Sequence, residues 1–215
     1  MEQDILYARH RERRMEEAVY AAAELFLKEG IEKVKMTDVA DAAAMGVASL
    51  YRYFGSKNVL VIRAGALLWR DVRTMYEHRF EPSVMAGLTG MERIRLLFSL
   101  LEELYRDHRP FISLIGQIDD FLAAQDVPRS ELKRYEESLL NFMTVFLEAF
   151  EAGVADGTVR PEVDPAIFFR TVCHSATALA LKLIRGPLLP GEHLEDPAEL
   201  HLLLDFALAY LTPDR

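Results

Sequence analysis

The sequence has little cysteine, glycine or proline, and these shortages exclude several classes of protein. Its 215 residues include one cysteine, Cys173, so a disulfide framework within the chain is excluded and a reducing compartment such as the cytoplasm is expected. No signal peptide is evident, and no charge-free apolar run approaches the roughly 20 residues that a membrane-spanning helix requires. With 51% hydrophobic residues and few helix breakers, we expect a soluble protein of the all-α class.

Positive charge is also scarce, which at first argues against a nucleic-acid partner. The chain carries 25 Lys and Arg against 34 Asp and Glu, a net charge of −9. The excess of acidic residues is unevenly distributed along the chain. Residues 1–57 hold 9 basic and 10 acidic residues, while the remainder holds 16 basic and 24 acidic residues. Phosphate binding requires local rather than global positive charge. Near the N-terminus, Arg9, Arg11, Arg13 and Arg14 are either a DNA-facing cluster or an ordinary solvated helix start.

The stretch between residues 36 and 60 contains two short helical patterns separated by an Ala-Met-Gly break. In the second pattern, Leu50 and Phe54 lie on one side of a helix, at 100° per residue. Ala48 and Arg52 lie on the opposite side, where they could contact another molecule. Two short helices joined by a tight turn form a helix-turn-helix, whose second helix enters the major groove of DNA.

A resemblance to the TetR-type transcriptional repressors rests on one run of residues in this stretch, D-V-A-x-A-A-x-x-G-x-A-S-L-Y-R-Y-F-G-S-K-x-x-L. It extends in detail over about residues 13–60 and shows two departures from the family pattern. The turn glycine, Gly46, sits two places late, and Lys35 stands where the family usually has a threonine. The resemblance implies an all-α chain with a three-helix DNA-binding domain at 1–58, its motif at about 35–54, and a helical effector-binding and dimerisation domain at 59–215.

The same resemblance implies the residues that contact DNA. By residue-for-residue match, base edges are approached by Val47, Ala48, Ser49 and Arg52, while phosphates or the backbone are held by Thr37, Tyr51, Tyr53 and Lys57. An arginine that pairs with guanine contributes about 1–3 kcal/mol of discrimination, so Arg52 is expected to set the preference at one base pair. Lys57 is expected to strengthen binding to all sequences alike. A two-fold dimer then requires a palindromic operator of double-stranded DNA.

Helical periodicity continues through the rest of the chain. We expect a first helix at about 9–28, ahead of the motif, and later helices at about 57–80, 94–105, 111–122, 130–155, 165–185 and 197–211. The first of the later helices begins at Lys57, so it is expected to couple an effector pocket to the DNA-binding domain. Asp164 followed by Pro165 is a helix-start signal, and Gly186 follows the end of that helix.

Two further sites are implied by the family and left open by the residues themselves. A pocket for a small effector would be lined by Trp69, Tyr76, Phe98, Tyr105, Phe111, Phe142, Met143 and Phe146, although such aromatic residues are more often core. A homodimer seam on the last two helices would use Phe169, Val172, Ala176, Leu179, Leu183, Leu200, Leu204 and Leu208, or these residues form the core of a monomer. Carboxylates at Glu102, Glu103, Asp119 and Asp120 favour an apolar, neutral or cationic effector, unless an arginine pairs with an anion.

Catalysis, a metal and a cofactor are not expected. His108, His174, His193 and His201 have none of the spacings typical of zinc or di-iron sites. Cys173 and His174 are adjacent and would point about 100° apart on a helix, which is poor geometry for a nucleophile and its base. The alternative to a repressor is an all-helical small-molecule-binding protein or enzyme with a vestigial DNA-binding head. No membrane partner is expected.

Overall fold

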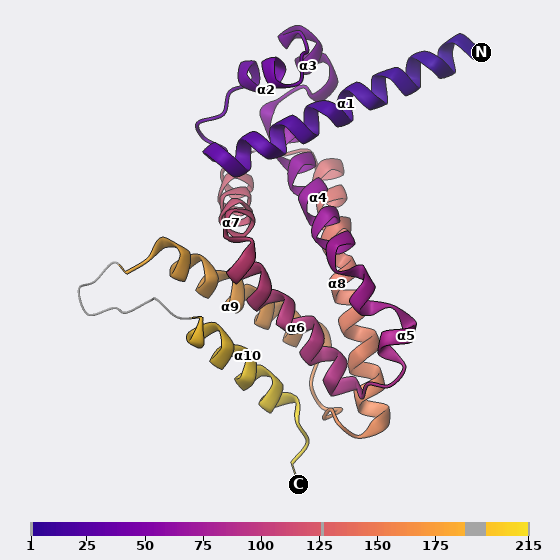
Figure 1. Cartoon of the computed structure of the whole chain (residues 1–215), viewed down its shortest axis with the longest axis vertical. Coiled ribbons are helices and arrows are strands. Elements are labelled where there is room, and N and C mark those ends of the chain that lie inside the picture. Colours follow the sequence, from indigo (N-terminus) through magenta and orange to yellow (C-terminus); the bar gives the residue numbers. More distant parts are fainter. Residues whose placement is uncertain (1, 126, 188–196, 215) are drawn as a thin grey trace. The chain divides into compact units, whose positions relative to one another are not determined.

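The computed structural model describes residues 2–125, 127–187 and 197–214, and within these ranges every regular element is a helix (Figure 1). The all-α class expected from the sequence is confirmed. The elements are α1 (Glu2–Glu29), α2 (Met36–Ala42), α3 (Val47–Phe54), α4 (Lys57–Tyr76), the 3-10 turn η1 (Glu77–Phe80), α5 (Pro82–Met85), α6 (Gly90–Asp107), α7 (Arg109–Ala124), α8 (Arg129–Asp156), α9 (Pro165–Arg185) and α10 (Ala198–Leu211).

The helices group into two compact units. Unit 1 comprises residues 1–73 and 114–138, and unit 2 comprises residues 74–113 and 139–215. Helices α4, α7 and α8 therefore contribute residues to both units. The DNA-binding domain predicted at 1–58 lies inside unit 1, which additionally includes most of α4 and parts of α7 and α8.

In unit 1, the apolar stripe of α1 covers the helix-turn-helix. Ala18, Ala22 and Phe26 of α1 are each at most 2% exposed, and so are Leu50 of α3 and Val39 of α2. The helix starts at Glu2, seven residues before the predicted start. Those seven residues include no glycine or proline, so nothing in them interrupts the helix. Its first turns project beyond the helices that it covers (Figure 1).

In unit 2, the loop after α8 joins three helices. The Asp156 carboxylate accepts hydrogen bonds from the Gly90 N–H at the start of α6, at 2.8 Å, and from the Thr158 hydroxyl. The Arg160 N–H donates to the Leu211 carbonyl at the end of α10, at 2.9 Å. The predicted start of α9 is confirmed, because the Asp164 carboxylate accepts from the Ile167 N–H at 2.8 Å.

Helix α9 is long and apolar enough to cross a membrane, judged by length and composition alone. Core helices of helical proteins have the same property, and α9 packs against α10 and α6 within unit 2. Its polar end residues Lys182 and Arg185 lie near its C-terminus, where positive side chains interact favourably with the helix dipole. Within unit 2, α9 buries one face, formed by Phe168, Phe169, Val172, Ala176, Ala180 and Leu183.

Two glycines allow α6 and α8 to approach closely. A Cβ atom added at Gly90 would lie 2.0 Å from the backbone nitrogen of Gly153 and 2.6 Å from the Ala149 carbonyl oxygen. Backbone atoms cannot move aside as the end of a flexible side chain can. The crossing of α6 and α8 therefore depends on a hydrogen atom at position 90.

This crossing generates a stability prediction. Gly90→Ala should lower the free energy of unfolding by about 3 kcal/mol or more, because the added methyl group overlaps the backbone of α8. The matched control is Gly87→Ala, where the added Cβ meets nothing within 4 Å and stability should change little. Urea unfolding followed by circular dichroism measures both variants. Equal stability of the two would contradict the close crossing.

Candidate nucleic-acid interface

Helix α3 presents one buried and one accessible side. Leu50 and Phe54 are 0% and 4% exposed and pack inward. None of the eight predicted DNA contacts is buried: Thr37, Ala48, Tyr51 and Arg52 are exposed, and Val47, Ser49, Tyr53 and Lys57 are half-buried. The accessible side thus contains small, hydroxyl-bearing and cationic side chains, which is the composition that reads base edges and phosphates. Their individual contacts with DNA remain predictions.

The turn between α2 and α3 keeps its geometry without glycine at its centre. Ala44 adopts the left-handed conformation, with φ of 47°, while Gly46 serves as the N-cap of α3 in an extended conformation. The left-handed conformation costs roughly 1–2 kcal/mol for a residue with a Cβ atom. Arg14 of α1 donates to the Ala44 carbonyl at 2.7 Å and so holds the turn against α1. This explains why the late glycine in the sequence does not disrupt the motif.

At the start of α2, the N-cap position holds Lys35 in place of the threonine usual in the family, and another residue provides the capping hydrogen bond. The Lys35 N–H donates to the Asp38 carboxylate at 2.7 Å. A side chain three residues into a helix that reaches back to the N-cap N–H is half of a capping box. Asp38 therefore satisfies the backbone N–H of the N-cap residue, Lys35. An acidic residue three positions after the N-cap is a signal that could have been found in the sequence.

Positive charge gathers around Tyr53 at the end of α3. The guanidinium carbon of Arg52 lies 5.4 Å from the centre of the Tyr53 ring, and that of Arg11 lies 5.8 Å from the same centre. Arg52 also approaches the Ser49 hydroxyl, at 3.4 Å. Cations are attracted to the face of an aromatic ring. The ring thus brings one guanidinium from α1 beside one from α3.

Lys57 has a partner that the sequence did not indicate. Its amine donates to the carbonyl of Ile31, the second residue after α1, and desolvation lowers the pKa of Lys57 while Glu32 and Asp38 oppose that shift. The N–H of Ile31 donates to the side-chain oxygen of Gln117 in α7, at 3.0 Å. We call this pair of hydrogen bonds the Ile31 clamp. Lys57 remains a predicted phosphate contact, but in the free protein its amine holds the backbone between α1 and α2.

Comparison with known proteins bears on this region directly. Residues 19–64 match the family model described as "Bacterial regulatory proteins, tetR family". The matched segment begins within α1, ends within α4 and contains the helix-turn-helix. This chain therefore carries a TetR-family DNA-binding domain at residues 19–64. Its function class, a DNA-binding transcriptional repressor, is the one expected from the sequence and is confirmed.

Known repressors are similar to this chain over most of its length. The HTH-type transcriptional repressor KstR2 of Mycolicibacterium smegmatis is 26% identical over 159 residues, 74% of each chain. The ketosteroid transcriptional regulator KstR2 of Mycobacterium tuberculosis aligns with a TM-score of 0.57 at 22% identity, over 94% of this chain and 96% of that one. Thermus thermophilus FadR, solved in complex with lauroyl-CoA, aligns with a TM-score of 0.62 at 21% identity, over 94% and 97%. The TetR fold therefore covers nearly the whole chain.

The predicted effector-contacting residues are mostly packed. Phe98 and Phe146 stack at 5.9 Å between ring centres, and Phe168 lies 5.9 Å from Phe146. Tyr76, Tyr105 and Phe111 are also buried, whereas Trp69, Phe142 and Met143 are half-buried. In unit 1, the Trp69 indole donates to the hydroxyl of Tyr135 at 3.3 Å. Phe98 and Phe146 thus form an aromatic core in this structure, and the effector assignment of the eight residues remains a prediction.

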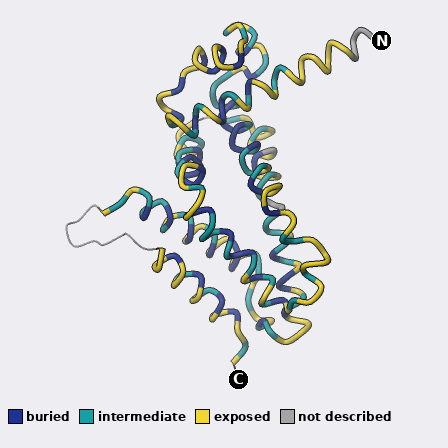
Figure 2. Tube along the Cα trace, viewed as in Figure 1, coloured by how far each residue is buried: buried dark blue, intermediate teal, exposed yellow. Residues whose placement is uncertain are grey.

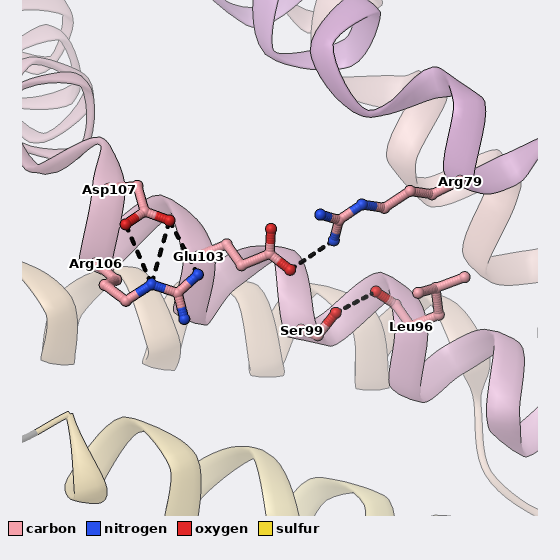
Figure 3. A network of polar contacts seen from close by, with 6 residues as sticks. All are labelled: Arg79, Leu96, Ser99, Glu103, Arg106 and Asp107. Atoms are coloured by element: carbon pink, nitrogen blue, oxygen red, sulfur yellow. Dashed lines mark hydrogen bonds and ion pairs between the residues drawn. The ribbon is translucent and has the colours of Figure 1, made fainter.

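Two of the carboxylates behind the predicted charge preference, Glu102 and Glu103 of α6, have partners in the structure. Glu103 binds Arg79, as Figure 3 shows, and Glu102 lies 2.8 Å from His201, whose pKa this hydrogen bond raises. A carboxylate neutralised by a neighbouring cation does not repel a bound anion as an unpaired one does. Glu103 therefore does not count against an anionic effector, and the charge preference, which also rested on Glu102, Asp119 and Asp120, remains a prediction.

The residues predicted to form the dimer seam are buried inside the protomer. Seven of the eight are at most 9% exposed and only Leu179 is half-buried: Phe169, Val172, Ala176 and Leu183 on α9, and Leu200, Leu204 and Leu208 on α10. Large apolar residues are instead exposed on another side of α10, namely Leu202, Phe206 and Tyr210, at 51%, 64% and 58%. These three recur every four residues and so share one face, the α10 stripe. The large exposed apolar side chains of α10 therefore lie on this stripe and not among the predicted seam residues.

The competing chemistry gains no support in the described ranges. No group of three or more histidine, cysteine or acidic side chains there could hold a metal ion, and His193 lies outside those ranges. Burial raises the pKa of the Cys173 thiol to about 12, so this side chain is protonated at neutral pH and a poor nucleophile.

The Ile31 clamp generates a prediction that separates two roles of Lys57. Lys57→Met should lower the free energy of unfolding by about 1.5–3 kcal/mol, because it leaves the Ile31 carbonyl without its charged donor. The control Lys33→Met removes an exposed lysine and should change stability little. Urea unfolding measures this effect. If Lys57 serves only to bind phosphate, Lys57→Met will be as stable as the control, and the only change will be a weaker salt dependence of DNA binding. That result would contradict a structural role for the lysine.

Proposed function

We propose that the protein is a homodimeric repressor that acts in the cytoplasm and leaves its operator when a small effector binds. Residues 1–58 form the DNA-binding domain, and residues 59–215 form the effector-binding and dimerisation domain. One observation carries the proposal: α3 buries Leu50 and Phe54 while Ala48, Tyr51 and Arg52 remain exposed. A buried side fixes the orientation of a short helix, and the opposite side is then free to enter the major groove.

The α10 stripe supports a two-fold dimer. Leu202, Phe206 and Tyr210 expose large apolar surface on a helix of 14 residues, and such patches on small proteins mark interaction sites. TetR-type repressors are homodimers built on their last two helices, and this similarity supports a partner at the same helix here. Two-fold symmetry then requires a palindromic operator, with half-site centres about 34–36 Å apart or a multiple of that distance.

The effector is proposed to have a large apolar body. An apolar body suits the aromatic side chains predicted to line the effector site, and the names of similar proteins include a ketosteroid regulator and a repressor solved with lauroyl-CoA. Because Glu102 and Glu103 are paired, an anionic head group is compatible with α6. A ketosteroid and an acyl-CoA thioester are accordingly the first compounds to test.

Coupling between effector and DNA is proposed to run along α4 and α7. Helix α4 contains both Lys57 and Trp69, and α7 contains both Phe111 and Gln117. A shift of either helix changes the geometry of the Ile31 clamp, and with it the position of α1 relative to α2. A coupling of about 1–3 kcal/mol changes affinity by a factor of 5–150 and acts reciprocally on both ligands.

A binding experiment tests the proposed function. We expect the protein to select a palindromic duplex from a random-sequence library, and lauroyl-CoA or a ketosteroid to weaken that complex by a factor of about 5–150. The selected duplex should weaken effector binding by the same factor, followed through the fluorescence of Trp69, the single tryptophan. No selection of any duplex would refute the repressor. Equal effector affinity with and without DNA would refute the coupling.

The dimer is tested by one substitution in the α10 stripe. Phe206→Glu places a charge at the proposed seam and should weaken dimerisation about 100-fold or more, since burying an unpaired charge costs several kcal/mol. Val84→Glu is the control, because it adds the same charge at an exposed apolar residue of α5. Leu204→Glu should instead unfold the protomer, because Leu204 is 3% exposed. Analytical ultracentrifugation and circular dichroism distinguish these outcomes, and a monomeric wild type at micromolar concentration would disprove the dimer.

A further inference from the structure

The first turns of α1 lie outside the part of the chain that the family model explains. The match begins at residue 19, whereas α1 begins at Glu2. Residues 6–13 are all exposed, and Figure 2 shows this part of α1 as a continuous exposed segment. At 1.5 Å per residue, the segment before residue 14 extends roughly 18 Å from the helix-turn-helix. We call residues 2–14 the N-terminal arm.

One face of the arm points toward the helix-turn-helix. Tyr7, Arg11 and Arg14 are spaced i, i+4 and i+7 and therefore share a face. Arg14 donates to the Ala44 carbonyl of the turn at 2.7 Å, and Arg11 lies over the Tyr53 ring of α3. Arg9 is about 200° around the helix from Arg11, so it points away from this face. Two contacts with different elements thus fix which arginine of the arm adjoins the DNA-binding surface.

The arrangement at Tyr53 leaves positive charge without a counter-ion. Arg11 and Arg52 both lie within 6 Å of the same ring centre, so two guanidinium groups share one ring. Within the described part of the chain, neither is paired with a carboxylate, whereas Arg13 and Arg14 share Glu17. Like charges placed together repel, and a bound anion relieves that repulsion. Guanidinium groups bind phosphate in bidentate geometry.

We propose that Arg11 binds a backbone phosphate of the DNA duplex and that Tyr53 positions it there. The inference rests on the proposed function, because α3 must lie on DNA for Arg11 to reach the backbone. The site is continuous with the α3 surface, and its positive charge is complementary to the phosphate. The tip of the arm is not included, since residues 2 and 4 are acidic. Arg11 thus adds a contact that strengthens binding without reading sequence.

The arm supplies its own matched control. Arg11→Ala and Arg9→Ala remove the same charge from exposed positions of one helix, two residues apart. The probes are the duplex that the wild-type protein selects from a random-sequence library and an unrelated duplex of the same length. Dissociation constants are measured over a series of salt concentrations. Circular dichroism and thermal unfolding verify that each variant is folded.

We expect Arg11→Ala to weaken binding of both duplexes by the same factor, roughly tenfold, and to reduce the salt slope by about one unit. Arg9→Ala should leave the slope near the wild-type value, and Arg11→Lys should restore most of it because the charge is kept. Arg52→Ala should instead lower the preference for the selected duplex.

Three results would overturn the inference. Wild-type behaviour of Arg11→Ala would show that Arg11 touches no phosphate, and equal losses in Arg9→Ala and Arg11→Ala would show that only net charge matters. A loss confined to the selected duplex would assign Arg11 to a base instead. If the wild-type protein selects no duplex, the proposed function itself fails. If the wild-type protein binds its selected duplex and Arg11→Ala binds it equally well, only the Arg11 contact is refuted and the proposed function stands.

Discussion

The backbone of Ile31 is held from two sides, and the placement of the DNA-binding helices in unit 1 depends on this constraint. Gln117 of α7 accepts its N–H, and Lys57 of α4 donates to its carbonyl. The preceding residue, Gly30, has φ of 86°, and a Cβ atom there would lie 2.9 Å from the Gln117 side-chain oxygen. The Ile31 side chain is 1% exposed. Because α4 and α7 both hydrogen-bond the backbone of Ile31, just after α1, a shift of any of these three helices strains a hydrogen bond at that residue.

Charge is distributed so that an acidic protein can still bind DNA. The net charge of −9 belongs mainly to the residues beyond the helix-turn-helix, where Glu103 is paired with Arg79 and Glu102 with His201. At α3, in contrast, Arg11 and Arg52 are gathered at one tyrosine ring. Screening over about 8 Å at physiological salt makes a phosphate sensitive to these nearby arginines more than to distant carboxylates. Local charge therefore decides the partner.

Helix α10 illustrates a limit of sequence periodicity. Leu200, Leu204 and Leu208 recur every four residues, and so do Leu202, Phe206 and Tyr210 on another face. Both series are apolar, so the pattern correctly indicated burial on more than one side but could not say which face packs inside the protomer. The structure buries the first series against α9 and α6 and leaves the second exposed. The predicted seam residues were chosen from the inward face for this reason.

By itself, the sequence determined the features that depend on neighbouring residues: the helices, the Asp164 start of α9, the family, and the inward and outward sides of α3. These follow from helical periodicity, capping chemistry and a contiguous motif, all readable within a few turns of chain. Only the tertiary structure decided that Lys57 and Gln117 share Ile31 and that Arg11 lies on Tyr53. Those contacts join residues 26 to 86 positions apart, and no local pattern encodes which distant group a side chain meets. Folding alone brings such groups together, because burial of the apolar faces fixes how the helices cross.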